Sequence, residues 1–91
     1  MSELETQYRQ IYSDLVKYIE NNTDKKIYKV LPDIKNLSPH QIDNIVSSNC
    51  MDLIQKLKRK DRDNAFVYYS TLVSKVRREN MNQITVITNQ Q

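Results

Sequence analysis

Glycine is absent from all 91 residues of the chain. This absence constrains the fold, because tight β-hairpins and β-bulges depend on residues that accept a positive φ at low cost. We therefore predict an all-α fold whose turns are made by Asn, Asp and the two prolines. A chain of this length has room for one domain with a single hydrophobic core.

The most apolar stretch of the chain covers residues 61–76. Its apolar side chains recur at three- and four-residue steps, and further apolar residues widen the stripe almost to a full wrap. A helix with so broad an apolar surface belongs in the middle of a bundle. We predict that this helix is central and that Phe66, the only Phe, is its largest apolar plug.

Four further helices are predicted, and they cover residues 2–21, 24–34, 39–47 and 49–60. The third has the clearest start signal, since Ser38 suits the N-cap, Pro39 the first helical position and Gln41 the reciprocal position of a capping box. The second is expected to stop or kink near its end, because Pro32 disfavours helical geometry at the residue before it.

Two boundaries complete the predicted organisation. A polar break at residues 47–49 is expected to separate the third helix from the fourth, with Asn49 as a cap. Residues 85–88 are β-branched throughout and favour an extended backbone. We therefore predict a helical bundle over residues 1–80, followed by a weak sixth helix or a frayed tail over residues 81–91.

Charge is distributed unevenly along the chain. Residues 1–54 carry six Lys or Arg against eight Asp or Glu, whereas residues 55–91 carry eight against three. The densest cationic cluster is Lys56, Lys58, Arg59, Lys60 and Arg62. A charge run of this kind is often a solvated helix end, but its density favours docking against a surface of opposite charge.

Catalysis and cofactor binding find little support in the sequence. The only His, His40, falls in a predicted first helical turn without a nucleophile beside it. The lone Cys50 cannot form an internal disulfide and is interpreted as a small side chain near a helix start. We predict a protein that is not an enzyme and binds no metal or cofactor. No apolar run is long enough to cross a bilayer and no signal peptide is evident, so a cytoplasmic location is expected.

Five segments together resemble the caspase recruitment domain (CARD) of the death-fold superfamily. They are IYSDLVKYI (11–19), LPDI (31–34), LSPHQIDNIV (37–46), MDLIQKLKRK (51–60) and NAFVYYSTL (64–72). The resemblance covers residues 8–78 and rests on core positions of a helical bundle. It implies a five- or six-helix antiparallel Greek-key bundle whose task is homotypic association without catalysis.

The resemblance also implies two complementary surfaces, because a basic face on the first and fourth helices of the family commonly meets an acidic face on the second and third. Carried onto this chain, the basic residues are Arg9, Lys17, Lys56, Lys58, Arg59 and Lys60. The acidic residues are Asp24, Asp33 and Asp43.

Three functions remain open at this stage. The first is a CARD-CARD interaction module that acts as an adaptor or decoy in apoptotic or innate-immune signalling, bound to another CARD-containing protein or to itself. The second is a small basic helical protein that binds nucleic acid with residues 56–62 and 75–78. The third is a structural subunit of a larger assembly.

Overall fold

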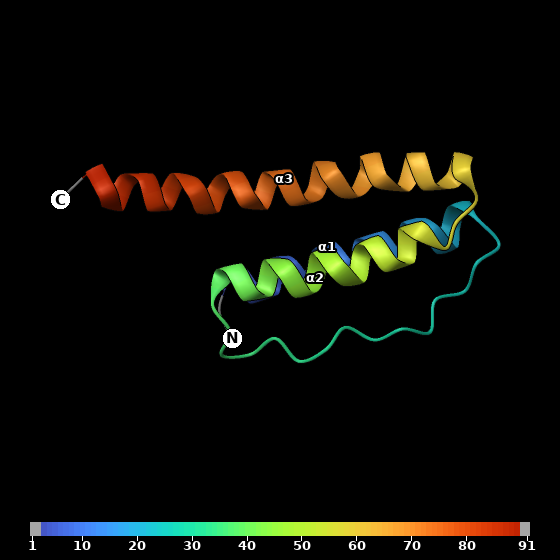
Figure 1. The fold of residues 1–91 in the computed structure, drawn as a ribbon, viewed down its shortest axis with the longest axis horizontal. Coiled ribbons are helices and arrows are strands. Elements are labelled where there is room, and N and C mark those ends of the chain that lie inside the picture. The colour runs from blue at the N-terminus through green and yellow to red at the C-terminus, as the bar shows by residue number, and fades with distance from the viewer. Residues whose placement is uncertain (1–2, 90–91) are drawn as a thin grey trace.

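Three helices make up the fold: α1 (Glu3–Asn22), α2 (Pro39–Gln55) and α3 (Arg59–Asn89). This computed structural model describes the backbone of residues 3–89 and the side chains of residues 3–80. α1 and α2 run in the same direction, and α3 returns antiparallel to both (Figure 1). The all-helical prediction is confirmed for the described residues, which contain no strand. The described residues hold three helices where five or six were expected.

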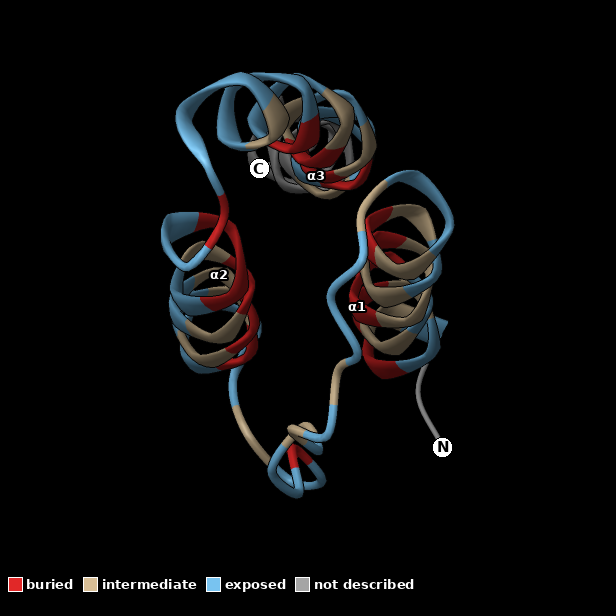
Figure 2. Ribbon diagram, turned by 90° about the vertical axis from the view of Figure 1, so that its right-hand side faces the viewer, coloured by how far each residue is buried: buried red, intermediate tan, exposed pale blue. Residues whose placement is uncertain are grey.

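The hydrophobic core lies between the three helices, and each of them contributes one stripe of side chains (Figure 2). α3 forms one wall of this triangle and is not surrounded by the others, so the prediction of a central helix over residues 61–76 was wrong. Its inward stripe is Ala65, Tyr69, Val73 and Val76. Phe66 follows Ala65 by about 100° of helical rotation and is 46% exposed, so it is not the core plug.

Residues 24–38 form an irregular extended segment that we call the return segment. It runs back along the bundle from the end of α1 to the start of α2, on the side away from α3 (Figures 1 and 2). Its anchor is Ile34, which is fully buried among the helices. The predicted helix over residues 24–34 was therefore wrong.

Two physical reasons favour the extended conformation here. Eleven residues span roughly 16 Å as a helix but roughly 36 Å when extended. Only the longer span returns the chain to the start of α2, which lies parallel to α1. In addition, Lys25, Lys26 and Lys29 would stack as like charges at three- and four-residue spacing in a helix.

α2 is one uninterrupted helix, so the predicted break at residues 47–49 was also wrong. The side chains of Ser47 and Asn49 form hydrogen bonds that leave the helical backbone intact. Ser47 Oγ donates to Asp43 Oδ1 at 3.1 Å, and Asn49 Nδ2 donates to the Ile45 carbonyl at 2.8 Å. The start of α2 is confirmed, because Ser38 and Gln41 form the expected capping box.

The backbone of α3 continues without a break as far as Asn89. Its C-terminal part projects past the N-terminal ends of α1 and α2 (Figure 1). The predicted sixth helix or frayed tail falls on residues 81–91, and the packing of those side chains lies outside the described residues.

Candidate functional site at the basic end of the bundle

Seven exposed cationic side chains gather at the end of the bundle where α1 and α2 finish and α3 begins. We call this region the basic end. It draws on the start of the return segment, the C-cap of α2, the short α2–α3 turn and the first turns of α3. Its members are Lys25, Lys26, Lys56, Lys58, Arg59, Lys60 and Arg62. Within the described part of the chain, none of the seven takes part in a salt bridge.

The fold brings these residues together because both chain reversals fall at the same end. At the first reversal, the backbone N–H of Thr23 donates to the Ile19 carbonyl at 2.9 Å and finishes α1. At the second, the backbone N–H of Leu57 donates to the Ile54 carbonyl at 3.1 Å, and the buried Leu57 side chain anchors the turn. The lysines that flank each reversal are left pointing into solvent.

A groove with an apolar lining lies within the basic end, between the return segment and the last turns of α2. Its volume is about 290 Å³, and its apolar lining comes from Ile27, Tyr28, Leu53 and Leu57. The lysines that line it are Lys25, Lys26, Lys29 and Lys56. Of these, Lys29 already pairs with Asp52, its Nζ lying 2.9 Å from Oδ2. The groove therefore combines an apolar lining with three unpaired cations.

Two apolar side chains of the return segment point away from the core beside this groove. Tyr28 is 88% exposed and Val30 is 82% exposed. Isolated exposed apolar side chains are common, but Tyr28 also lines the groove, so its ring adds exposed apolar area there.

The first turn of α3 carries several cations, which are unfavourable at the N-terminal end of a helix. Arg59, Lys60 and Arg62 lie near the positive end of the helix dipole, and Asp61 is the only acidic residue in that turn. Clustered like charges in this position are locally unfavourable. Such conflicts between a local rule and the sequence concentrate at functional sites.

The basic residues named from the sequence are only partly brought together. Lys56, Lys58, Arg59 and Lys60 belong to the basic end, where they join Lys25 and Lys26. Arg9 lies on α1 between Glu5 and Asp33, with N–O distances of 3.5 and 3.7 Å. Lys17 is exposed on α1.

The three acidic residues do not form a common face. Asp24 follows α1 at the basic end, and Asp33 lies in the return segment beside Arg9. Asp43 forms hydrogen bonds within the bundle to Arg77 and Tyr8. A contiguous acidic surface built from these three residues is therefore not present.

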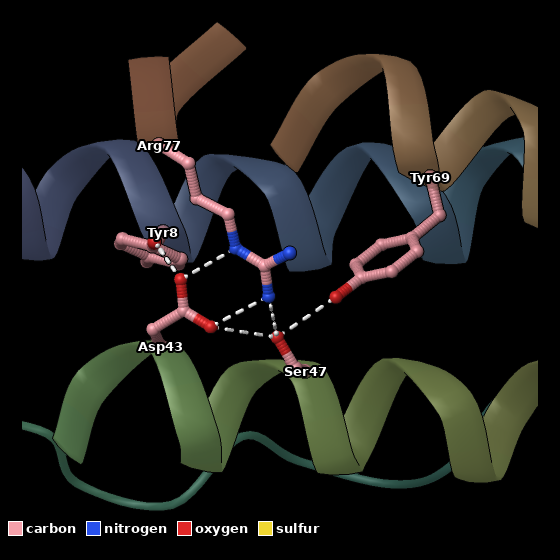
Figure 3. A network of polar contacts seen from close by, with 5 residues as sticks. All are labelled: Tyr8, Asp43, Ser47, Tyr69 and Arg77. Atoms are coloured by element: carbon pink, nitrogen blue, oxygen red, sulfur yellow. Dashed lines mark hydrogen bonds and ion pairs between the residues drawn. The ribbon is translucent and has the colours of Figure 1, made fainter. Parts of the chain in front are cut away.

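A polar network connects all three helices through Asp43 (Figure 3). Arg77 of α3 donates to both Asp43 carboxylate oxygens at 2.8 Å, from Nε and Nη2. The Tyr8 hydroxyl of α1 donates to the same carboxylate. Ser47 donates to Asp43 and accepts from the Tyr69 hydroxyl at 2.8 Å. The Arg77 guanidinium holds the pKa of the Asp43 carboxyl at about 2, and burial raises the pKa of Tyr8.

Two parts of this site were not predicted from the sequence. Lys25 and Lys26 were assigned to a helix, and only the parallel arrangement of α1 and α2 places them beside the α2–α3 turn. The polar network was missed as well, although Asp43 and Ser47 at four-residue spacing beside a core stripe were a readable signal.

Cys50 lies in the middle of α2, fully buried, and not near a helix start. Burial raises the pKa of its thiol to about 12, so the reactive thiolate is scarce at neutral pH. We expect a thiol reagent such as dithionitrobenzoate to label the native protein far more slowly than the urea-unfolded protein. Equal labelling rates in the two states would contradict the burial of this side chain.

Among the described residues, no cluster of three or more His, Cys, Asp or Glu side chains is suited to hold a metal ion. None of the helices in the described part of the chain has both the length and the hydropathy to cross a membrane. A scan of protein-family models and searches of curated proteins and of solved structures each found no match to this chain.

Proposed function

We propose that this chain is a non-catalytic protein-interaction module that binds an acidic surface of a partner protein through its basic end. The observation that carries this proposal is the gathering of seven exposed cations from separate segments at one end of the bundle, none of them in a salt bridge within the described residues. Three of the seven, Lys25, Lys26 and Lys56, line a groove with an apolar lining. The cations supply orientation and partner choice, and the groove supplies apolar area.

The energetics fit a surface of this composition. A single exposed ion pair contributes only about 0.2–1 kcal/mol, so no one lysine is expected to dominate. Several acting together steer the encounter and reject partners of the wrong charge. Binding should weaken as salt rises, because exposed charges are screened over roughly 8 Å at physiological ionic strength.

The CARD resemblance supplies the proposed class of partner. It suggests another CARD-type domain that presents an acidic face, and an adaptor or decoy role in apoptotic or innate-immune signalling. The return segment replaces the helix that the family has at this position. Support for binding therefore comes from the basic end and not from a shared six-helix plan.

A different protein is a better partner than a second copy of this chain. Homotypic pairing needs an acidic face, and the structure does not assemble one from Asp24, Asp33 and Asp43. We expect the purified protein to remain monomeric in light scattering across a concentration series at low and physiological salt. Oligomers that dissociate as the salt concentration rises would instead indicate charge-guided self-association.

A nucleic-acid partner is the second candidate, favoured by Tyr28. An exposed aromatic ring among lysines is the arrangement on which single-stranded bases stack. This candidate differs in one testable way, because it would also use the cations of residues 75–78 on α3. Those residues lie at least 13 positions beyond Arg62 along the helix, which separates the two clusters by roughly 20 Å or more.

Paired double variants separate the two candidates. Lys58→Glu with Arg59→Glu reverses two charges at the basic end, and Lys75→Glu with Arg78→Glu reverses two exposed charges elsewhere on α3. Each double variant lowers the net charge by four, from +3 to −1. The probes are a fluorescein-labelled ten-residue polyglutamate peptide and a ten-nucleotide oligouridine, followed by fluorescence anisotropy.

We expect polyglutamate binding to fall at least about ten-fold in the first variant and to change little in the second, since the loss follows the position of the charges and not their sum. Circular dichroism should show unchanged helical content in both. Equal losses in the two variants would contradict a localised site. Oligouridine binding that exceeds polyglutamate binding and weakens in both variants would favour nucleic acid.

A further inference from the structure

The return segment has the side-chain alternation of a β-strand over residues 27–31. Ile27, Lys29 and Leu31 are half-buried against the helices, whereas Tyr28 and Val30 are exposed. In such an extended chain, the backbone N–H and C=O groups of alternate residues point to opposite edges. The segment therefore has one edge toward α1 and one edge toward α2.

The edge toward α1 is already bonded. The Ile27 backbone N–H donates to Glu20 Oε2 at 2.9 Å, and the Tyr12 hydroxyl donates to the Lys29 carbonyl at 2.8 Å. Both partners lie on α1. The backbone groups of Ile27 and Lys29 thus define this edge, and those of Tyr28 belong to the opposite one.

The edge toward α2 is open. Within the described residues, the Tyr28 backbone forms no hydrogen bond to another backbone group or to a side chain. The groove of the basic end lies along this same edge, between residues 25–29 and the side chains of Leu53 in α2, Lys56 at its C-cap and Leu57 in the turn that follows. An unpaired strand edge is a template for another extended chain.

We propose that this groove receives an extended peptide segment of the partner, which pairs with the return segment as an added β-strand. The inference rests on the proposed function and names the form of the acidic partner. The strand would exchange backbone hydrogen bonds with Tyr28 and its even-numbered neighbours. Main-chain pairing gives affinity in this mode of recognition, and pockets for alternate side chains give specificity.

The groove also sets the composition of the partner segment. Leu53 and Leu57 favour an apolar side chain pointing inward. The three unpaired lysines, Lys25, Lys26 and Lys56, favour carboxylates on either side of it. The fitting partner is an extended segment in which acidic and apolar residues alternate.

The probe is a fluorescein-labelled nine-residue peptide of alternating Glu with Val or Leu, used below the concentration at which it associates with itself. Its controls are two versions in which the backbone nitrogens of odd or of even positions are methylated. These keep every charge and side chain but block one edge of the strand. The polyglutamate peptide and the oligouridine complete the set.

We expect the unmodified peptide to bind at least about ten-fold more tightly than polyglutamate, which lacks the apolar contact, and than the methylated version whose pairing edge is blocked. The version methylated on the other edge should bind like the unmodified peptide. In the protein, Tyr28→Pro removes the backbone donor, and Tyr28→Ala retains it. Binding should fall about five-fold further in the Pro variant than in the Ala variant.

The remaining outcomes separate this inference from the function on which it rests. Strand addition would be overturned if the alternating peptide, both methylated versions and polyglutamate bound equally well. If that binding were also lost in the Lys58→Glu, Arg59→Glu variant, the proposed function would still stand. Absence of binding by every acidic peptide would overturn both. Tighter binding of oligouridine than of any peptide would also overturn the inference.

Discussion

Replacing Ile34 with Ala is expected to lower the free energy of unfolding by about 2–5 kcal/mol. Ile34 is the only fully buried side chain of the return segment within the described residues, and it packs among the side chains of the bundle core. Truncation removes buried methyl groups and leaves a cavity that the helices fill only in part. For a domain of this size, such a loss is a large share of the total stability.

The matched control is Val30→Ala, on the same segment but 82% exposed, which should change the free energy of unfolding by less than about 0.5 kcal/mol. Urea unfolding followed by circular dichroism measures both variants. If the two variants prove equally stable, the return segment does not dock as described. Ile34 lies outside the groove. A loss of peptide binding in the Ile34→Ala variant would therefore indicate that the return segment has detached from the helices.

Acidification is expected to remove stability that the polar network provides. The folded protein holds the pKa of Asp43 at about 2, below its ordinary value of 3.8. A depressed folded-state pKa contributes stability that is present above pH 4 and is lost as the pH falls toward 2. With the Asp43 side chain 19% exposed, we expect a loss of roughly 1–2 kcal/mol across this window.

Asp43→Asn should remove most of this pH dependence and lower stability at neutral pH, since Arg77 loses its bidentate partner. Asp52→Asn is the control, because its pair with Lys29 is solvent-exposed and should contribute little. Urea titrations at pH 7, 4 and 2.5 provide the comparison. An unchanged pH profile in the Asp43 variant would show that this carboxylate is not the group responsible.

The sequence predicted those parts of the fold that depend on local signals. The first helix and the capping box at Ser38 and Gln41 are set by side chains within a few residues of one another, and both were predicted correctly. The return segment was wrongly predicted to be helical. Its extended conformation follows from the parallel arrangement of α1 and α2, which no local sequence pattern indicates. Phe66 was misplaced for a similar reason, since Ala65 allows the closer helix contact and takes the inward position.

The candidate site was predictable in part. The run from Lys56 to Arg62 was evident as a charge cluster, but its division between the C-cap of α2, the α2–α3 turn and the start of α3 required the structure. The groove was not predictable, because it exists only where the return segment passes α2. The four-residue spacing of Asp43 and Ser47 was a local signal of their contact, but the pairing of Asp43 with Arg77, 34 residues away, has no local signal in the sequence.

The most direct test of the binding site is a titration of the isotope-labelled protein with the alternating acidic peptide, followed by the backbone amide signals in nuclear magnetic resonance. We predict shifts concentrated at residues 25–30 and 53–62, with the Tyr28 amide gaining protection from hydrogen exchange. Signals of the polar network around Asp43 should stay unchanged. Shifts centred on residues 75–78, or spread evenly over the three helices, would contradict a binding site at the basic end.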